Sequence, residues 1–338
     1  MTENNSARFH GEISGGISVV IPAYNAETVI GRAIDSVLDQ VHPPREIIVI
    51  DDGSVDQTRS VVEAYGERVR YLHQENAGAS VARNTGVQAA RFDWIAFLDG
   101  DDQWLPDRLR RQAELLSRHP DLRWVTGNFY RCQCEQDHKQ EVDLTELQRR
   151  MIAPGIQDGE VFESYFQAHA CGAMGCMDTM LIRKELLVEA GLFLPGQKRM
   201  NDVDLWLRMA YLHPRIGYVF QPLAVYHMGV TGSILKEHRE PEHIEQFLQR
   251  HFRLAGAAGI SDAFRPFAAQ LLGWWVGQRM REGKGSEVRY FLKTYRHLFS
   301  PASFRKQYVW SWCPALCIAY NRLKKQIQTS IRKKKVGL

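Results

Sequence analysis

Short apolar segments alternate with segments of helical periodicity between residues 17 and 116, and this alternation constrains the fold most. Four apolar runs are too short for buried helices and are predicted as strands: 17–21, 47–50, 69–73 and 94–98. Strands that alternate with helices at short intervals predict an α/β fold with a doubly wound, mostly parallel sheet. Since these strands are apolar on both faces, helices are expected to cover both.

Local signals place the helices between these strands. Asn25 is predicted to cap the first helix, and Ser54 with Gln57 fits a capping box for the second. Residues 79–90 are predicted to form a helix rich in small residues. Pro106 is expected in the first turn of a further helix, whose apolar residues are Leu109, Leu115 and Leu116.

Polar clusters follow three of the predicted strands. They are Pro22-Ala23-Tyr24-Asn25, Asp51-Asp52-Gly53-Ser54 and Asp99-Gly100-Asp101-Asp102. In doubly wound sheets, ligands bind beyond the carboxyl ends of the strands. The three clusters are therefore expected to converge on one site.

The third cluster has the composition of a divalent-cation site. Asp99 and Asp101 flank a glycine, and an extended D-x-D directs both carboxylates to the same side. Oxygen ligands suit Mg²⁺ or Mn²⁺, and such an ion can neutralise a diphosphate. The alternative is a solvated acidic turn at a strand end.

The other clusters leave alternatives open. Asp51 and Asp52 fit a turn with a helix cap, or carboxylates that accept hydrogen bonds from a base or ribose. Arg83, expected on a helix near the same edge, can pair with a phosphate or with a neighbouring aspartate.

A second acidic cluster opens a helical pattern about a hundred residues later. Asp202 lies in the first turn, where the helix dipole favours its anionic form, so it is a candidate general base. Asp204 is predicted to pair with Arg208 four residues on, and Trp206 to be a core residue. His227 is either a third metal ligand, a phosphate partner or a structural histidine.

Together these stretches resemble the family 2 glycosyltransferases, which are inverting enzymes of the GT-A fold. The similar stretches, in the order of the family, are 20–25, 49–54, 76–84, 97–102 and 201–208. The resemblance covers about residues 17–235. It implies a GT-A-like, Rossmann-like sheet that binds a nucleoside diphosphate sugar, usually a UDP-sugar.

The resemblance also implies a role for individual residues. Pro22, Tyr24 and Asn25 would line the nucleotide pocket, with Arg83 close by. Asp52 would bind the base, Asp99 would contact the ribose or sugar, and Asp101 would ligate the metal, with His227 as a less certain ligand. Asp202 would deprotonate the acceptor hydroxyl, so that one displacement inverts the anomeric centre.

The chain departs from the family pattern in places. The family commonly has Glu before the base, where this chain has Asn201, and the late motif around residues 226–233 is blurred. Processive members of the family carry several membrane spans. This sequence shows none, so a single-addition enzyme that extends a glycan or lipid-linked acceptor in cell-surface polysaccharide synthesis is expected.

Composition and patterning suggest how the 338 residues are divided. Hydrophobic residues make up 44% and charged residues 24%, as in a globular protein. We predict a flexible tail over 1–16, the catalytic domain over 17–235, a helical appendage over 236–300 and a basic, aromatic tail over 301–338. The segment 130–175 is weakly periodic and is interpreted as an insertion beside the acceptor.

The tail holds most of the basic character. Residues 301–338 contain nine Lys or Arg and no Asp or Glu, which leaves 34 basic and 39 acidic residues elsewhere. Residues 308–320 are apolar and aromatic but too short to cross a bilayer. This composition suits an interfacial anchor on the anionic cytoplasmic leaflet. The alternative is a helix packed on the protein, followed by a basic end.

The cysteines and the charge raise further alternatives. Six cysteines with no signal peptide before them are expected to be reduced thiols in the cytoplasm. A zinc site formed by Cys132, Cys134, Cys171 and Cys176 is possible but poorly spaced. A sugar-nucleotide pyrophosphorylase would need a glycine-rich basic loop after the first strand. A silent nucleotide-sugar scaffold keeps some support from Asn201, and a nucleic-acid binder would leave the acidic clusters without a purpose.

Overall fold

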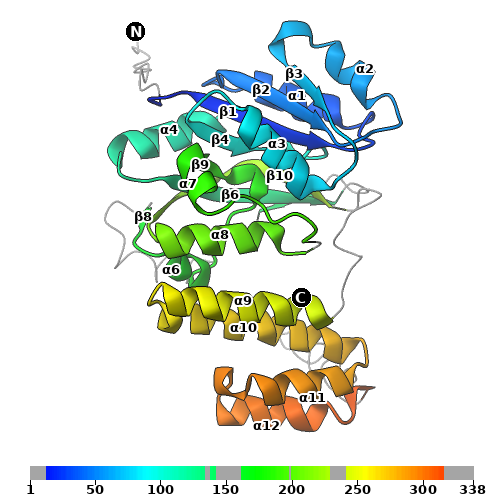
Figure 1. The fold of residues 1–338 in the computed structure, drawn as a ribbon, viewed down its shortest axis with the longest axis vertical. Helices are drawn as coiled ribbons and strands as arrows, with labels where there is room; N and C mark the ends of the chain where they lie inside the picture. The colour runs from blue at the N-terminus through cyan, green and yellow to red at the C-terminus, as the bar shows by residue number, and fades with distance from the viewer. Residues whose placement is uncertain (1–12, 134–137, 142–160, 198, 229–240, 316–338) are drawn as a thin grey trace, which may run out of the picture. The chain divides into compact units, whose positions relative to one another are not determined.

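The computed structural model describes residues 13–133, 138–141, 161–197, 199–228 and 241–315 (Figure 1). The chain divides into two compact units, residues 1–239 and 240–338. The first unit contains the sheet, and the described part of the second is helical.

One sheet of ten described strands organises the first unit. Eight of them follow the order β3-β2-β1-β4-β9-β6-β10-β5, while β7 pairs with β6 and β8 with β10. Their bounds are β1 Ile17–Ala23, β2 Glu46–Asp51, β3 Arg70–His73, β4 Trp94–Phe97, β5 Gln103–Trp104, β6 Trp124–Gln133, β7 His138–Glu141, β8 Val161–Phe162, β9 Leu181–Arg183 and β10 Ile216–Met228.

Strand direction divides the sheet into two parts. The four strands predicted before residue 100 are parallel to one another, in the order β3-β2-β1-β4. On the far side β6 and β10 are also parallel, and β9 lies between β4 and β6, antiparallel to both. The predicted α/β fold with a doubly wound, mostly parallel sheet is confirmed.

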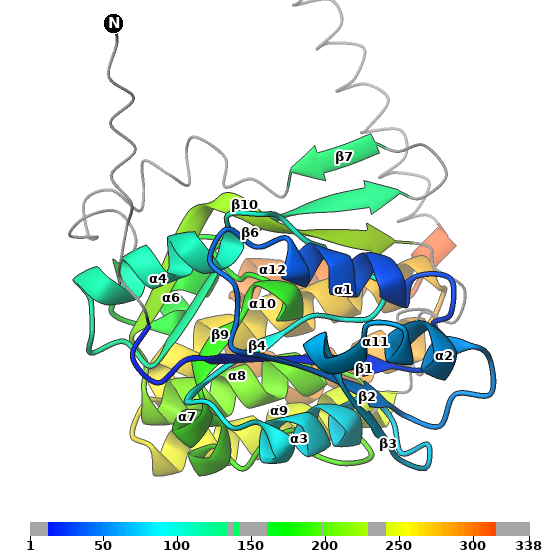
Figure 2. The same cartoon turned by 90° about the horizontal axis from the view of Figure 1, so that it is seen from above.

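Helices cover both faces of the parallel strands. In the first unit they are α1 Ile30–Leu38, α2 Thr58–Glu63, α3 Ala79–Ala89, α4 Arg108–Arg118, α6 Tyr165–Ala170, α7 Lys184–Glu189 and α8 Asn201–Leu212, with short turns η1 Gly66–Arg68 and η3 Met177–Thr179. Figure 2 shows α1 and α3 on opposite sides of β1 and β2. Helix α3 packs closely because Gly86 faces the β1 side chain of Val20, where an added Cβ would lie 2.2 Å from Cγ1.

Two capping predictions were wrong. Helix α1 begins at Ile30 and has no side-chain cap. Asn25 instead has a positive φ of 48°, and its N–H donates to Ser54 Oγ over 2.9 Å while its Oδ1 accepts the N–H of Val55. Helix α2 starts only at Thr58, so the predicted capping box does not form. Asn25 and Ser54 thus link the loops after β1 and β2.

The apolar run of residues 177–182 forms a strand only in its second half. Residues 177–179 form the turn η3, and β9 begins at Leu181. The chain before β1 is also partly ordered, because Ile13 packs on the core and accepts a hydrogen bond from the Gly16 N–H. The rest of the predicted N-terminal tail lies outside the described residues.

The second unit is built from α9 Pro241–Ala257, α10 Ser261–Arg281, α11 Gly285–Thr294, the turn η5 Arg296–Leu298 and α12 Pro301–Trp310. The apolar side chains Ile244, Phe247 and Leu248 of α9 are buried. In α10, Trp275 is buried, while its neighbour Trp274 is 56% exposed. No helix among the described residues has the length and apolar character needed to span a bilayer.

Candidate functional site

The ends of β1, β2 and β4 lie side by side because these strands are parallel neighbours. The Asp52 N–H donates to the carbonyl of Ala23 over 2.8 Å, which joins the first two ends. Gly100 brings the third end close, since a Cβ there would lie 3.0 Å from the Pro22 carbonyl oxygen. The three polar clusters of the sequence therefore meet at one edge of the sheet.

Three carboxylates gather beside β4. Oxygens of Asp99, Asp102 and Asp178 all lie within 4.8 Å of one another. Asp178 Oδ1 accepts the backbone N–H of Asp99 over 2.9 Å, which fixes the strand end. Asp102 and Asp178 are each only 1% exposed. We call these three residues the carboxyl cluster.

Burial and repulsion between neighbouring carboxylates make Asp102 and Asp178 retain protons. Burial, followed by repulsion from Asp101 and Asp99, raises the pKa of Asp102 to about 8. Burial and the nearby Asp102 also raise the pKa of Asp178 well above its usual value. The pKa of Asp101 is raised, by burial first and then by Asp99. A cation would relieve this repulsion.

The carboxyl cluster fits a small divalent cation. Its donors are oxygens, which Mg²⁺ and Mn²⁺ prefer. Asp102 Oδ2 is buried and has no hydrogen-bond partner in the described part of the chain, so a ligand atom is available. This set differs from the predicted ligands Asp101 and His227, because it uses Asp102 and the unforeseen Asp178.

His227 reaches the carboxyl cluster through the sheet. Strand β5 follows Asp102 directly and pairs with β10, which carries His227. The His227 backbone N–H donates to Asp102 Oδ1 over 2.6 Å, and its Nδ1 lies 3.7 Å from the same oxygen. Asp101 lies near enough for the charges of His227 and Arg32 to lower its pKa in part. The structure thus brings both predicted ligands to the edge of the cluster.

Arg83 joins the first acidic stretch to the second. It extends from α3, and its guanidinium donates to Asp99 Oδ1 over 2.5 Å. Burial alone would lower the pKa of Arg83, but Asp99 and then Asp202 attract its charge and raise it. Of the two partners that the sequence left open, the structure shows the aspartate.

Asp202 lies at the start of α8, after Met200 in the left-handed region with a φ of 54°. Burial raises its pKa, Arg83 partly offsets this, and Asp99 adds repulsion. The dipole effect expected from the sequence is therefore outweighed by burial. These interactions bring Asp202 to Arg83 and Asp99, although they are 100 or more residues apart in the sequence.

Asp52 is held by the chain around it. Its carboxylate accepts hydrogen bonds from Gln74 Nε2 and from the backbone N–H groups of Ala77 and Gly78, over 2.7–2.9 Å. It is 4% exposed, so in this structure it orders the loop before α3. Asp51 accepts the hydroxyl of Tyr71 over 2.6 Å.

The nucleotide-pocket candidates after β1 differ in exposure. Pro22 is buried at the strand end, while Tyr24 is 54% exposed. Asn25 is exposed and bonded to the loop after β2, as described above. Tyr24 is the aromatic side chain that this edge presents to solvent.

Several neighbours have structural partners. Asp204 pairs with Arg208 over 2.8 Å, and Trp206 is 4% exposed, as predicted. Asn84 makes two hydrogen bonds with the backbone of Phe193, and Asn201 donates to Ser80 over 3.1 Å. These contacts fix α3 and α8 around the site.

Asp178 and Arg108 are the site residues that sequence reasoning missed. Asp178 is a carboxylate within an apolar run, and that contrast was the available signal. Arg108 is fully buried, lies 3.7 Å from the Trp104 ring centroid and donates to the Met180 carbonyl. Burial lowers its pKa to about 9, while Asp178 favours its charged form. No sequence signal separates Arg108 from an exposed helix residue.

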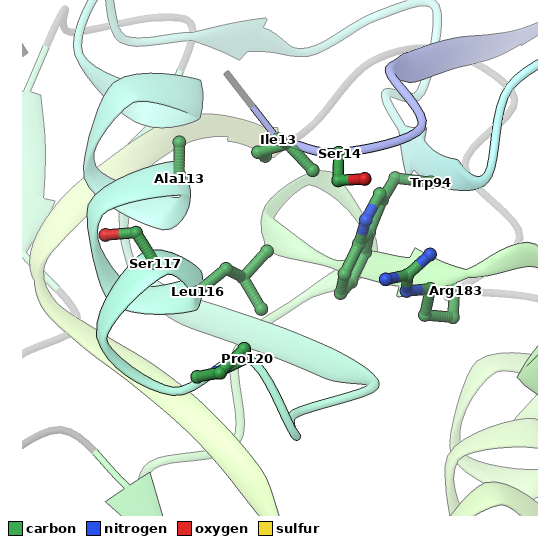
Figure 3. Close-up of a pocket in the computed structure, with 8 residues that line it drawn as sticks. All are labelled: Ile13, Ser14, Trp94, Ala113, Leu116, Ser117, Pro120 and Arg183. Carbon is green, nitrogen blue, oxygen red and sulfur yellow. The ribbon is translucent and has the colours of Figure 1, made fainter. Parts of the chain in front are cut away.

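A small cavity of 190 Å³ lies at the other end of β4 (Figure 3). Its walls include Ile13, Leu116, Trp94 and Arg183, and the guanidinium carbon of Arg183 is 4.7 Å from the Trp94 ring centroid. Trp94 begins the strand whose other end leads to Asp99. This apolar cavity is therefore separate from the carboxyl cluster.

Among the described residues, the side chains grouped closely enough to hold a metal ion together are three aspartates, and no cysteine belongs to that group. Cys132 is buried and Cys171 and Cys176 are partly exposed, all as free thiols. Cys134 lies outside the described residues, as do half of the predicted insertion and the end of the basic tail.

Comparisons with known proteins agree with this geometry. The model of the family described as "Glycosyl transferase family 2" matches residues 18–179. TuaG of Bacillus subtilis, a glycosyltransferase assigned to teichuronic acid biosynthesis, is 32% identical over 57% of this chain and 71% of its own. The Escherichia coli enzyme WfgD, a UDP-Glc:α-D-GlcNAc-diphosphoundecaprenol β-1,3-glucosyltransferase, is 39% identical over 33% of this chain and 45% of its own.

Solved structures support the fold. Residues 1–349 of S. aureus TarS, crystallised with UDP-GlcNAc, superpose with a TM-score of 0.60 at 17% identity, covering 90% of this chain and 91% of that one. Some curated relatives are longer, and the chain spans 58% of an uncharacterised glycosyltransferase of Rickettsia prowazekii. The motifs, the sheet and the relatives agree, and the chain belongs to the family 2 glycosyltransferases, with their GT-A fold.

Proposed function

We propose that this chain is a metal-dependent, inverting glycosyltransferase that moves a sugar from a UDP-sugar to a hydroxyl of a glycan or lipid-linked acceptor. The observation that carries the proposal is the meeting of Asp202 with Arg83 and Asp99 beside the carboxyl cluster. In this arrangement, a candidate base lies next to a candidate diphosphate site.

The choice of donor and acceptor is supported by relatives. WfgD is named as a UDP-Glc glucosyltransferase acting on a diphosphoundecaprenol-linked sugar, and TarS was crystallised with UDP and with UDP-GlcNAc. TuaG is assigned to teichuronic acid biosynthesis. We therefore place this chain in cell-surface polysaccharide synthesis. Tyr24 and Pro22 would line the nucleotide pocket, with Asn25 shaping its loop and Asp52 as the contact to the base.

Asp202 is the base in this mechanism. Its raised pKa makes it a stronger proton acceptor than an exposed aspartate. It takes the proton of the acceptor hydroxyl as that oxygen forms a bond to the anomeric carbon. The bond from that carbon to the diphosphate oxygen breaks, its electron pair leaves with the diphosphate, and the configuration inverts.

The chain's own charges prepare the site for the leaving group. Arg83 offers a cation beside Asp99, and the carboxyl cluster, with Asp101 and His227 at its edge, would hold Mg²⁺ or Mn²⁺. When bound, that ion supplies charge stabilisation to the departing diphosphate. Arg108 would offset the cluster's charge from the protein core.

Thermal unfolding with UDP, GDP or CDP, each with and without Mn²⁺, tests the donor assignment. Stabilisation by UDP that requires Mn²⁺ is expected, because a ligand that binds only the folded state raises its stability. If none of the three nucleotides raises Tm, with or without Mn²⁺, the proposal is refuted. If UDP raises Tm, a donor screen read by UDP release identifies the sugar.

The Asp202→Asn variant tests the base. We expect transfer to be lost while UDP binding with Mn²⁺ remains, because the amide keeps the shape but accepts no proton. Glu185→Gln is the matched control, since Glu185 is an exposed carboxylate in the first turn of α7. If wild-type protein binds UDP but transfers nothing in the donor screen, the silent scaffold is the better description.

We also propose that the enzyme works on the cytoplasmic face of a membrane. The basic residues near the C-terminus support this, because anionic lipids attract such segments. A lipid-linked acceptor would be presented at that surface.

A further inference from the structure

The stretch of the second unit that has basic but no acidic residues begins before the predicted tail. Glu287 is the last acidic residue, and residues 288–338 contain twelve Lys or Arg with no Asp or Glu. The preceding 287 residues then hold 31 basic and 39 acidic residues, a net of −8. From within α11 onward, the acidic and basic side chains are therefore all basic, and this stretch begins among residues that the structure describes.

Helices α11 and α12 lie side by side (Figure 1), and three cations of the first segment lie over aromatic rings of the second. The Arg289 guanidinium carbon lies 4.0 Å from the Trp312 ring centroid, Lys293 Nζ lies 5.7 Å from Tyr308, and the Arg296 guanidinium carbon lies 5.1 Å from Phe304. The cations are three or four residues apart along α11 and η5, and the rings are four apart along α12 and the turn after it, so the three pairs form one row between the two segments. We call these six residues the aromatic–basic face.

Backbone contacts hold the two helices together. Arg289 also donates to the Ser311 carbonyl over 2.8 Å. Gly285 makes the close approach possible, since a Cβ there would lie only 2.0 Å from the same oxygen. A neighbouring face of α11 is buried, through Val288, Phe291 and Leu292. Lys293, Arg296 and Trp312 are exposed, so part of the aromatic–basic face is open to solvent at the edge of the contact between the two helices.

Apolar side chains stand exposed beside these charges. Val309 is 68% exposed and Trp312 63%. Arg305, which is exposed, is four residues before Val309 and lies over the same side of α12. Soluble domains seldom place large apolar groups and unopposed cations together unless the surface binds something.

The combination favours an anionic bilayer over a soluble polyanion. A polyanion needs the cations alone, whereas Trp, Tyr and Val gain by entering the interfacial layer of a membrane while Arg and Lys remain at the headgroups. We propose that the aromatic–basic face, with Arg305, Lys306 and Val309, docks on an anionic lipid bilayer. This rests on the proposed membrane location and specifies the surface that makes the contact.

Vesicle flotation of the full-length protein tests the proposal. We expect binding to vesicles that contain phosphatidylglycerol and little binding to phosphatidylcholine alone. The Arg305→Gln/Lys306→Gln double variant should bind about 25-fold more weakly, at about fivefold for each cation lost. Val309→Glu should lose at least about fivefold, because it removes an apolar contact and adds an anion.

Matched controls separate this surface from general charge effects. Val188→Glu changes a valine that is 58% exposed on α7, and Arg68→Gln removes an exposed cation from the first unit. Both should float like wild type. UDP release without vesicles should be unchanged in all variants, which keeps this test independent of the transfer reaction.

Each other outcome overturns the proposal. If wild type does not float, both the membrane location and the docking face are wrong. If wild type and all variants float equally, the contact lies elsewhere in the chain. If heparin competes with vesicles and Val309→Glu binds heparin and vesicles as wild type does, the surface is a polyanion site.

Discussion

Asp102 should make the metal-free protein less stable as the pH rises from 6.5 to 8. Its pKa is raised from 3.8 to about 8 by burial and by the neighbouring carboxylates. In this window the unfolded chain has lost the Asp102 proton and the folded protein retains it. The free energy of unfolding therefore falls as pH rises. At about 1.4 kcal/mol per unit over about 1.5 units, the loss is on the order of 2 kcal/mol for Asp102 alone.

The lower limit of the window is set by His169. Burial lowers its pKa from 6.5 to about 4, so the unfolded chain takes up a proton on His169 before the folded protein does. Its contribution to stability is lost as pH falls below 6.5, which opposes the effect of Asp102 there. Above pH 6.5 His169 is largely neutral in both states, so Asp102 determines how the free energy of unfolding changes with pH.

Thermal unfolding in a chelator at pH 6.5 and pH 8 measures this effect. A loss of about 2 kcal/mol should lower Tm by about 4–8 °C in a unit of this size. Asp102→Asn, a neutral side chain of the same shape, should remove most of that difference. Mn²⁺ at pH 8 should restore the stability of wild type, because the cation takes the place of the proton.

The control is Asp107→Asn. Asp107 is the partly exposed residue just before α4, and its hydrogen bond with Arg110 lowers its pKa, so it does not titrate in this window. It should keep the pH dependence of wild type. The reasoning is refuted if chelated wild type is as stable at pH 8 as at 6.5, or if Asp102→Asn shows the same slope as wild type.

Three more predictions follow from single contacts. The transfer rate should fall as pH falls through the raised pKa of Asp202, and a pH–rate profile flat on its acid side would contradict its role as base. Gly86→Ala should cost about 1–3 kcal/mol in urea unfolding, because the new Cβ would press on Val20. Arg108→Met should cost about 1–3 kcal/mol in urea unfolding, because the buried Met180 carbonyl loses its hydrogen-bond donor; wild-type stability in this variant would show that the donor is not needed.

The parallel half of the fold was readable because each strand is a short apolar run with a polar stop. Residues 17–21, 47–50, 69–73 and 94–98 all lie within strands of the structure or within one residue of their ends. Parallel pairing then brings the polar stops to one edge, so their meeting follows from topology.

The second half of the sheet was missed because its strands lack a simple pattern. Strand β10 contains Pro222, and its pairing with β6 shifts register on both sides of that residue. Its burial therefore departs from a regular alternation. The roles of Asp178 and Arg108 depend on this half, so they could not be derived without it.

Local rules failed where a distant contact competed. Asn25 and Ser54 both fit caps by sequence, yet they bind each other's loops across 29 residues. These contacts join two strand ends of the site, and they replace the helix caps that the local sequence favoured.

Strand β9 is only three residues long, yet it joins the parallel strands to the rest of the sheet. Asp178 stands just before it and bonds the end of β4. A one-residue insertion between Asp178 and Leu181 would displace the carboxylate from the Asp99 N–H while leaving the hydrophobic content of the chain unchanged. The spacing between this turn and β9 therefore fixes where the carboxylate stands at the end of β4.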